Sequence, residues 1–207
     1  MKEIKTAILV SGGGTNLQAI IDASGRGELP HVKLSLVLSS REGAYALERG
    51  AAAGIPGFAL SKKALGSQAA FEEALLEKLA DYQIEIIVLA GFLSILSEDF
   101  VKRYENRILN VHPSLIPAFC GDGFYGLKVH EAALARGVKL TGATVHLVNA
   151  ETDGGPILAQ KAVRVYPGDT PEKLQKRVMR QAEWKLLPAA LEQVAKGLSE
   201  IAPPHLD

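Results

Sequence analysis

The stretch TAILVSGGGTNLQAII, residues 6–21, decides the fold class of this chain. It begins with a short continuous apolar run, passes through three successive glycines, and continues with apolar residues at helical spacing from Leu17. This order predicts a β-strand, a tight loop and an α-helix. The same order opens the alternating β-α series of parallel sheets.

Strands and helices are expected to alternate through the first half of the chain. Apolar runs predict further strands at 32–38, 57–60, 84–89 and 107–111. Helical patterns lie between these strands at 44–53, from the N-cap residue Ser67 onward, and at 97–104. This alternation predicts an α/β fold with a doubly wound, mostly parallel sheet of the Rossmann type, with helices on both faces and right-handed crossovers.

The second half of the chain has a different pattern. Prolines and glycines crowd residues 113–126, and a helical stretch follows at 127–135. Two β-rich segments, 141–148 and 157–165, are separated by a polar loop that contains Asp153. These two segments either pair as a long hairpin or flank an insertion.

A C-terminal helix closes the predicted order of elements. Thr170 as N-cap and Pro171 at the first helical position mark its start. The apolar pattern runs to about Leu187, Pro188 is expected to kink or restart the helix, and the helical segment ends at about residue 199. The tail 203–207 is expected to fray. We expect one domain over residues 1–207.

Composition excludes several classes of protein. Among 207 residues, 47% are apolar and 22% charged, as in ordinary globular proteins, and 23 Lys and Arg balance 23 Asp and Glu. No net charge attracts nucleic acid or an acidic membrane. Cys120 is the only cysteine, which excludes an internal disulfide and favours a reducing compartment such as the cytoplasm. The N-terminal apolar run is too short for a signal peptide. The five histidines do not have the spacing of zinc ligands, so we expect no metal site.

The glycine-rich loop, residues 11–16, is a candidate phosphate site. The N-terminus of a helix that follows such a loop offers free backbone N–H groups and a positive dipole end. Leu17 stands where a dinucleotide motif has its third glycine, and the Lys of a nucleoside triphosphate loop is absent. A phosphate monoester therefore suits the loop best. A plain glycine turn is the alternative.

Asn110 and His112 lie at the carboxyl end of a predicted strand, where open α/β sheets bind ligands. Residues two apart in a strand project from the same side, and an amide beside an imidazole suits a reaction that develops an oxyanion and moves a proton. Asp153 is a candidate to orient and charge His112. The alternatives are a histidine that caps a strand end and an aspartate that forms a turn. No G-x-S-x-G elbow supports Ser114 as a nucleophile.

Four segments together resemble the folate-dependent formyltransferase family, and in particular its phosphoribosylglycinamide branch. These segments are ILVSGGGTNLQAII (8–21), IIVLAGFLSIL (86–96), ILNVHPSLIPAF (108–119) and GATVHLVNAETDGGPIL (142–158). The pattern N-x-H-P-S-L-x-P at 110–117 is shared by the whole family, whereas S-G-x-G-T-N-L-Q at 11–18 is more particular to that branch. The resemblance spans nearly the whole chain.

The resemblance implies an activity. It is transfer of the formyl group of the cosubstrate 10-formyltetrahydrofolate to the amine of glycinamide ribonucleotide, which gives formylglycinamide ribonucleotide and tetrahydrofolate in purine synthesis. The implied partners are small-molecule substrates, with no nucleic acid, membrane or metal. Oligomeric state stays open.

The resemblance also implies site residues. The catalytic residues are Asn110, His112 and Asp153. The phosphoribosyl substrate is bound by Gly14, Thr15, Asn16 and Glu183. The folate is bound by Gln68, Leu93, Ser94, Ile95, Leu96, Asn110, Asn149, Ala150, Glu151, Thr152 and Asp153. Residues 1–105 then form the phosphoribosyl half, 106–166 the catalytic and folate loops, and 170–199 the C-terminal helix.

The chain departs from its relatives at several positions. Gln68 and Ser94 stand where many of them carry a basic residue, the segment 120–125 is longer than in some, and one extra residue precedes Glu183. Formyltetrahydrofolate deformylase and methionyl-tRNA formyltransferase are alternatives, but both normally carry an extra domain, and here the first strand begins near Thr6. A non-catalytic phosphosugar or folate-binding module is a further alternative.

Overall fold

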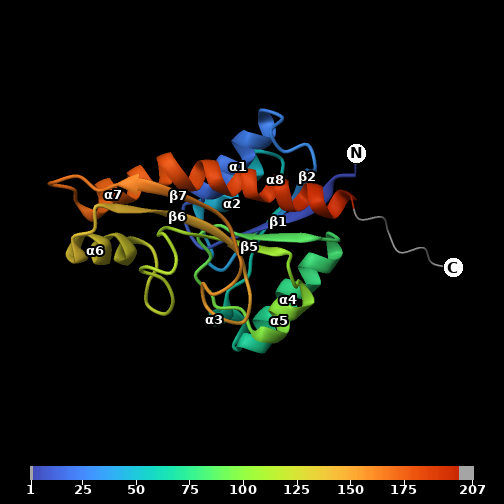
Figure 1. Ribbon diagram of the computed structural model, residues 1–207. Helices are drawn as coiled ribbons and strands as arrows, with labels where there is room; N and C mark the ends of the chain where they lie inside the picture. The colour runs from blue at the N-terminus through green and yellow to red at the C-terminus, as the bar shows by residue number, and fades with distance from the viewer. Residues whose placement is uncertain (1, 201–207) are drawn as a thin grey trace.

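A computed structural model describes residues 2–200 and places seven strands in one sheet, in the order β3-β2-β1-β4-β5-β6-β7 (Figure 1). The strands are β1 (Ile4–Val10), β2 (Val32–Ser39), β3 (Gly57–Ala59), β4 (Ile86–Leu89), β5 (Ile108–His112), β6 (Leu140–Leu147) and β7 (Ile157–Arg164). Strands β1 to β5 pair in parallel, and β6 and β7 add antiparallel strands at one edge. The predicted mostly parallel α/β fold is confirmed. The two β-rich segments that follow residue 140 pair directly with each other.

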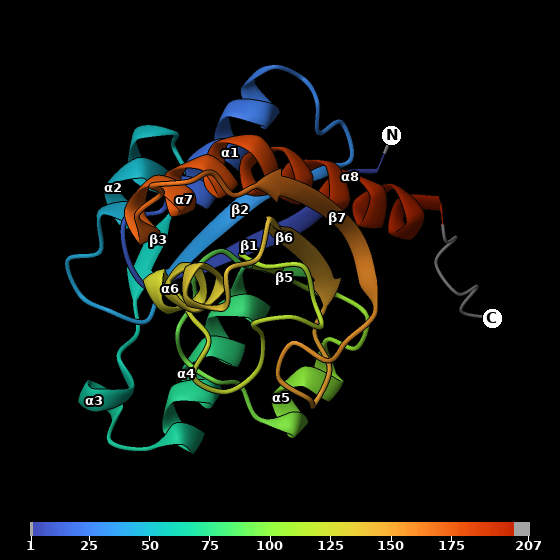
Figure 2. The ribbon, with the colours of Figure 1, turned by 60° about the vertical axis from the view of Figure 1, so that its left-hand side comes forward.

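Helices cover both faces of the sheet (Figure 2). One face packs against α1 (Thr15–Gly25), α2 (Tyr45–Ala52) and α8 (Trp184–Glu200), and the other against α4 (Gln68–Asp81) and α5 (Glu98–Arg103). Side chains of β1 alternate between the two cores: Ile8 joins the first and Leu9 the second. Burial on both faces explains why the parallel strands are continuous apolar runs.

The structure corrects two expectations about helices. A short helix that we did not predict, α3 (Lys62–Leu65), precedes α4. The expected restart of the C-terminal helix at Pro188 does not occur: α7 (Pro171–Val178) passes through a π-helical turn, η1 (Met179–Glu183), into α8, which continues through Pro188 to Glu200, near the expected end at about residue 199. The irregularity lies one turn before Pro188. A proline crowds the carbonyl four residues earlier, here that of Trp184, where the π turn gives way to α8. The expected frayed tail, 203–207, lies outside the described residues.

Strand order determines where a ligand can bind. The chain moves from β1 outward to β2 and β3, then returns to the other side of β1 to form β4, β5 and the antiparallel pair. The loops that follow β1 and β4 therefore lead away from each other and leave a crevice at the carboxyl ends of these strands. The loops after β1, β4 and β5 meet at that crevice.

Gly14 caps the N-terminus of α1 in the left-handed region, with φ +71°. A Cβ atom at this position would lie 2.6 Å from the Cβ of Ala46 and 2.9 Å from its Cα. The glycine loop is also tied to α2 by a hydrogen bond of 3.1 Å from the Ala46 N–H to the Gly12 carbonyl. Gly14 thus lets the loop pack closely on α2.

We predict that Gly14→Ala lowers the free energy of unfolding by about 2 to 4 kcal/mol, because it combines a left-handed backbone with a steric overlap against α2. Gly12→Ala is the matched control, since a Cβ there meets no atom within 4 Å. Urea unfolding of both variants measures the difference. Equal midpoints for the two variants would contradict the close packing on α2.

Candidate active site

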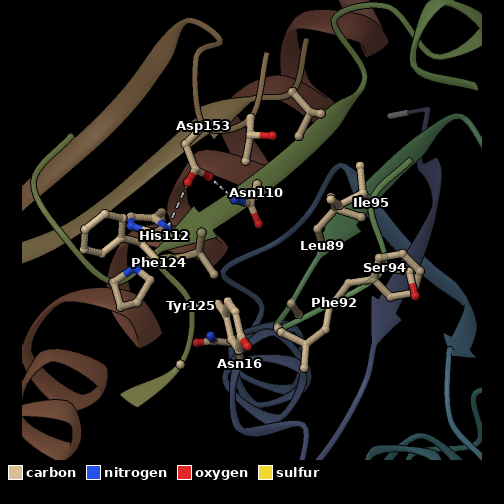
Figure 3. Close-up of a pocket in the computed structure, with 18 of the residues that line it drawn as sticks. Asn16, Leu89, Phe92, Ser94, Ile95, Asn110, His112, Phe124, Tyr125 and Asp153 are labelled. Atoms are coloured by element: carbon tan, nitrogen blue, oxygen red, sulfur yellow. Dashed lines mark hydrogen bonds and ion pairs between the residues drawn. The ribbon is translucent and has the colours of Figure 1, made fainter. Parts of the chain in front are cut away.

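A cavity of about 740 Å³ occupies the crevice at the carboxyl ends of the strands. Its walls come from the loops after β1, β4 and β5, from residues 121–126, from the β6–β7 loop, and from the C-terminal helix. Cavities of this size hold small-molecule ligands. Figure 3 shows that Asn110, His112 and Asp153 converge at one side of it, Asn16 and Tyr125 lie at another, and Phe92, Ser94 and Ile95 at a third.

Asn110, His112 and Asp153 lie together, as the sequence predicts (Figure 3). His112 Nδ1 is 3.4 Å from Asp153 Oδ2, and Asn110 Nδ2 donates to Asp153 Oδ1 at 3.4 Å. Asn110 and His112 come from the end of β5, and Asp153 from the β6–β7 loop. The arrangement joins an amide donor, an imidazole and a carboxylate at the wall of the cavity.

Asp153 is held in its charged form. Burial alone would raise the pKa of its carboxyl, but contacts from His146 and the Gly121 N–H and the charges of His112 and His146 outweigh burial, so the pKa lies below its ordinary value. The Gly121 N–H donates to Asp153 Oδ2 at 2.9 Å. A buried carboxylate with these donors provides negative charge at neutral pH.

His146 is a site residue that sequence reasoning missed. It lies on β6 directly opposite Asn110, with Nε2 3.1 Å from Asn110 Nδ2 and 3.5 Å from Asp153 Oδ1. Its place beside Asn110 depends on the antiparallel register of β5 and β6. No pattern in the sequence predicts that register.

The ring of His112 also contacts the loop that follows β5. His112 Nε2 donates to the Phe119 carbonyl at 2.8 Å, while Nδ1 faces Asp153. Both ring nitrogens therefore face oxygen acceptors, which a doubly protonated imidazole satisfies. A ligand oxygen can accept from Nε2 only by replacing the Phe119 carbonyl.

Asn16 and Glu183 meet at the end of the cavity that is formed by α1 and the C-terminal helix. Asn16 Nδ2 donates to Glu183 Oε2 at 2.8 Å, although the residues are 167 positions apart. Gly14 and Thr15 begin α1, whose first turn has no side-chain cap and no acidic residue, so its N–H groups are available to an anion. The two parts of the expected phosphoribosyl site therefore adjoin.

Glu183 lies at the end of the π-helical turn. A π turn accommodates one extra residue within a helix, which agrees with the additional residue before Glu183 in the sequence. Burial raises the pKa of the Glu183 carboxyl to about 7, although the hydrogen bond from Asn16 opposes this shift. Near neutral pH this carboxyl can therefore act as a donor or an acceptor.

His130 is a second cavity residue that the sequence did not reveal. It lies on α6 (Leu127–Arg136), is fully buried, and neither ring nitrogen has a hydrogen-bond partner within residues 2–200. Burial, and next the charge of His112, lowers the pKa of His130 to about 4. His130 is therefore neutral at physiological pH.

The expected folate residues form the third wall of the cavity, with one difference. Leu93, Ser94, Ile95, Leu96, Asn149, Ala150, Glu151, Thr152 and Asp153 all line it. Gln68 does not: its amide donates to Glu72 Oε1 at 2.6 Å and to the Ile95 carbonyl at 2.9 Å. Gln68 braces the loop after β4 from outside the cavity. Ile95, 74% exposed, offers this wall an apolar side chain that a flat ring can cover.

Two kinds of feature are absent from residues 2–200. None of the helices there has the length and apolar character needed to cross a bilayer. Within the same residues, no three His, Cys, Asp or Glu side chains are grouped to hold a metal ion.

The fold and the cavity define a class of protein: the chain belongs to the formyl transferase family, whose sequence profile matches residues 4–191. This family membership confirms the resemblance carried by the motifs.

Similar proteins within the family carry more specific names. Phosphoribosylglycinamide formyltransferase of Haemophilus influenzae is 37% identical over 193 residues, which cover 93% of this chain and 88% of that protein. Glycinamide ribonucleotide transformylase 1 from Symbiobacterium toebii, a crystal structure, matches with a TM-score of 0.88 at 41% identity over 94% of this chain and 89% of that one. The trifunctional purine biosynthetic protein adenosine-3 of Gallus gallus is 42% identical over 96% of this chain, which spans 19% of that protein's length.

The raised pKa of Glu183 makes the free energy of unfolding depend on pH. Its folded pKa of about 7 lies above the ordinary 4.5, so its protonated form favours folding below pH 4.5, and this contribution is lost as pH rises through 7. We predict that wild type loses roughly 2 to 4 kcal/mol between pH 5 and pH 8 through this group, and that Glu183→Gln removes the loss.

Urea unfolding of Glu183→Gln and wild type across this pH range measures the effect. Glu48→Gln, at an exposed position of α2, is the control and should follow wild type. If the free energy of unfolding changed with pH in the same way for Glu183→Gln and wild type, burial would not be raising the pKa of the Glu183 carboxyl.

Proposed function

We propose that the chain transfers the formyl group of 10-formyltetrahydrofolate to the amine of glycinamide ribonucleotide, in line with relatives named phosphoribosylglycinamide formyltransferase and glycinamide ribonucleotide transformylase. One observation carries the proposal: a single cavity joins an open helix N-terminus, an Asn–His–Asp cluster and an apolar wall. An anionic substrate, a reacting centre and a flat ring system can therefore occupy it together. The single cysteine suits the reducing cytoplasm as the place of this reaction.

The two substrates are assigned to opposite ends of the cavity. Gly14, Thr15 and Asn16 bind the phosphate through backbone N–H groups, and Glu183 meets the ribose hydroxyls. The loops 93–96 and 149–153 enclose the pterin. Residues 1–105 provide the phosphoribosyl half together with the folate loop 93–96, residues 106–166 the catalytic and remaining folate loops, and residues 170–199 the helix that completes the ribose site.

The reaction begins when the substrate amine attacks the formyl carbon. The C–N bond forms, the carbonyl electron pair moves to oxygen, and the tetrahedral intermediate collapses as the folate nitrogen leaves with the proton that the amine loses. Asn110 donates to the oxyanion, and His112 Nε2 donates to it after the formyl oxygen replaces the Phe119 carbonyl. Asp153, with Oδ2 3.4 Å from His112 Nδ1, orients the imidazole and passes protons through water. The protein mainly contributes position and electrostatics.

The test of the function is product formation from both substrates. Formylglycinamide ribonucleotide should appear only when both are present. Formate release that does not depend on the ribonucleotide would indicate a deformylase, and binding of both ligands without turnover would indicate a non-catalytic module.

His112→Ala should lower kcat at least about 100-fold and leave KM nearly unchanged, because the imidazole donates to charge that exists mainly in the transition state. Steady-state kinetics measures both constants, and a urea unfolding curve checks the fold. A variant that keeps more than about a tenth of wild-type turnover would refute this role.

Asp153→Asn keeps the size of the side chain and removes its charge, so kcat should fall by about 100-fold or more. Asp99→Asn is the matched control, because Asp99 is an exposed aspartate on α5 that does not line the cavity and should change kcat little. Equal rates for the two variants would return Asp153 to the role of a turn former.

A further inference from the structure

Arg49 on α2 contacts the glycine loop from outside the main cavity. Its Nε donates to the Gly13 carbonyl at 2.8 Å, and its Nη1 donates to Gln18 Oε1 on α1 at 2.9 Å. The guanidinium also lies over the ring of Tyr45, 4.9 Å from the ring centroid. These three contacts fix one planar group against the loop and the start of α1.

The hydrogen bond from Arg49 sets the direction of the next N–H group. The Gly13–Gly14 peptide bond is trans, so its C=O and N–H point in opposite directions. Because the C=O faces α2, the Gly14 N–H faces away from α2. Gly13 and Gly14 line the main cavity, and Arg49 does not. Arg49 therefore directs this N–H group toward the cavity.

A second carbonyl of the loop is held in the same way. The Ala46 N–H donates to the Gly12 carbonyl at 3.1 Å, so the Gly13 N–H also faces away from α2. Within residues 2–200, the N–H groups of Gly13 and Gly14 donate to no backbone carbonyl. Successive N–H groups that face one side can hold an anion oxygen between them.

The charge of Arg49 favours an anion at the same end of the cavity. In the described part of the chain, its guanidinium contacts a carbonyl, an amide oxygen and an aromatic ring, and it forms no ion pair with a carboxylate. The positive end of the α1 dipole lies at the same loop. Arg49 thus supplies the loop with both a fixed conformation and a nearby positive charge.

We propose that Arg49 is a positioning residue for the phosphate of the ribonucleotide, because it orients the Gly13–Gly14 peptide so that the loop can bind a phosphate monoester. This inference rests on the proposed function and specifies how its phosphate site is built. Arg49 acts through the loop and does not touch the ligand. Its effect is therefore confined to ligands that carry the phosphate.

The experiment compares glycinamide ribonucleotide with its dephosphorylated ribonucleoside. Arg49→Met keeps an apolar side chain of similar length and removes the donors and the charge. Its KM for the ribonucleotide should rise about tenfold. The kcat, the KM for the folate donor and the kcat/KM for the ribonucleoside should each change by less than about twofold. A urea unfolding curve checks that the variant is folded.

Two further variants sharpen the test. Arg49→Lys, the milder change, keeps the charge but loses the planar fork that reaches Gly13 and Gln18 together, so its KM for the ribonucleotide should stay at least about threefold above wild type. Arg103→Met makes the same change of charge and size at an exposed position of α5 that does not line the main cavity. It should leave every constant unchanged.

Inorganic phosphate gives a test that needs no turnover. Calorimetry should show that phosphate binds Arg49→Met about tenfold more weakly than wild type. Product formation by wild type tests the proposed function separately. If wild type forms no product and yet binds phosphate in a way that depends on Arg49, the proposed function fails and the positioning role holds.

Four results would overturn the role of Arg49. Equal losses for the ribonucleotide and the folate donor would mean that the variant disturbs the whole cavity. An equal loss for the ribonucleoside would mean that the phosphate is not the group affected. Full recovery in Arg49→Lys would mean that charge alone is enough. An unchanged KM in Arg49→Met would mean that the loop keeps its orientation without the guanidinium.

Discussion

The buried carboxylate of Asp153 is the constraint on which the site depends. A charge in this setting must be satisfied by donors, and Asn110, His112, His146 and the Gly121 N–H gather around it from β5, β6 and the loop after β5. The backbone after it permits this approach, because a Cβ at Gly155 would lie 1.8 Å from the Leu147 carbonyl oxygen. One carboxylate thus joins parts of the chain that only the fold brings together.

The sheet explains why these groups face one cavity. The reversal of strand order at β1 opens a crevice, and the helix that follows β1 directs its free N–H groups into it. On the far side, the π turn before α8 presents Glu183 to Asn16. The reacting cluster lies between these features and the apolar loop after β4. Its geometry therefore follows from strand order together with one irregular helical turn.

Much of this could be predicted from the sequence, because the signals were local. Continuous apolar runs identified the parallel strands, and glycines after the first run identified the loop before α1. The spacing of Asn110 and His112 placed both on one side of a strand end. Asp153 was a candidate from its polar loop, Glu183 entered through the motifs of a family, and the structure places them beside His112 and Asn16.

The remainder depends on long-range geometry. His146 joins the site through strand register, and His130 through the burial of α6. The contact of the Phe119 carbonyl with His112 depends on the conformation of the loop after β5. Prolines and glycines predict that a loop is present there, but they do not predict its path. The π turn at Met179–Glu183 leaves no signal in the apolar spacing of the C-terminal helix. Local patterns predict elements, whereas pairing and packing decide which side chains meet.

The central claim is that Asp153 is charged inside the folded protein because the surrounding donors outweigh its burial. A ¹³C NMR titration of its carboxyl group tests this directly. We predict a midpoint below the ordinary aspartate pKa of 3.8. A midpoint above 3.8 would mean that burial prevails, and would contradict the account of a permanent negative charge beside His112.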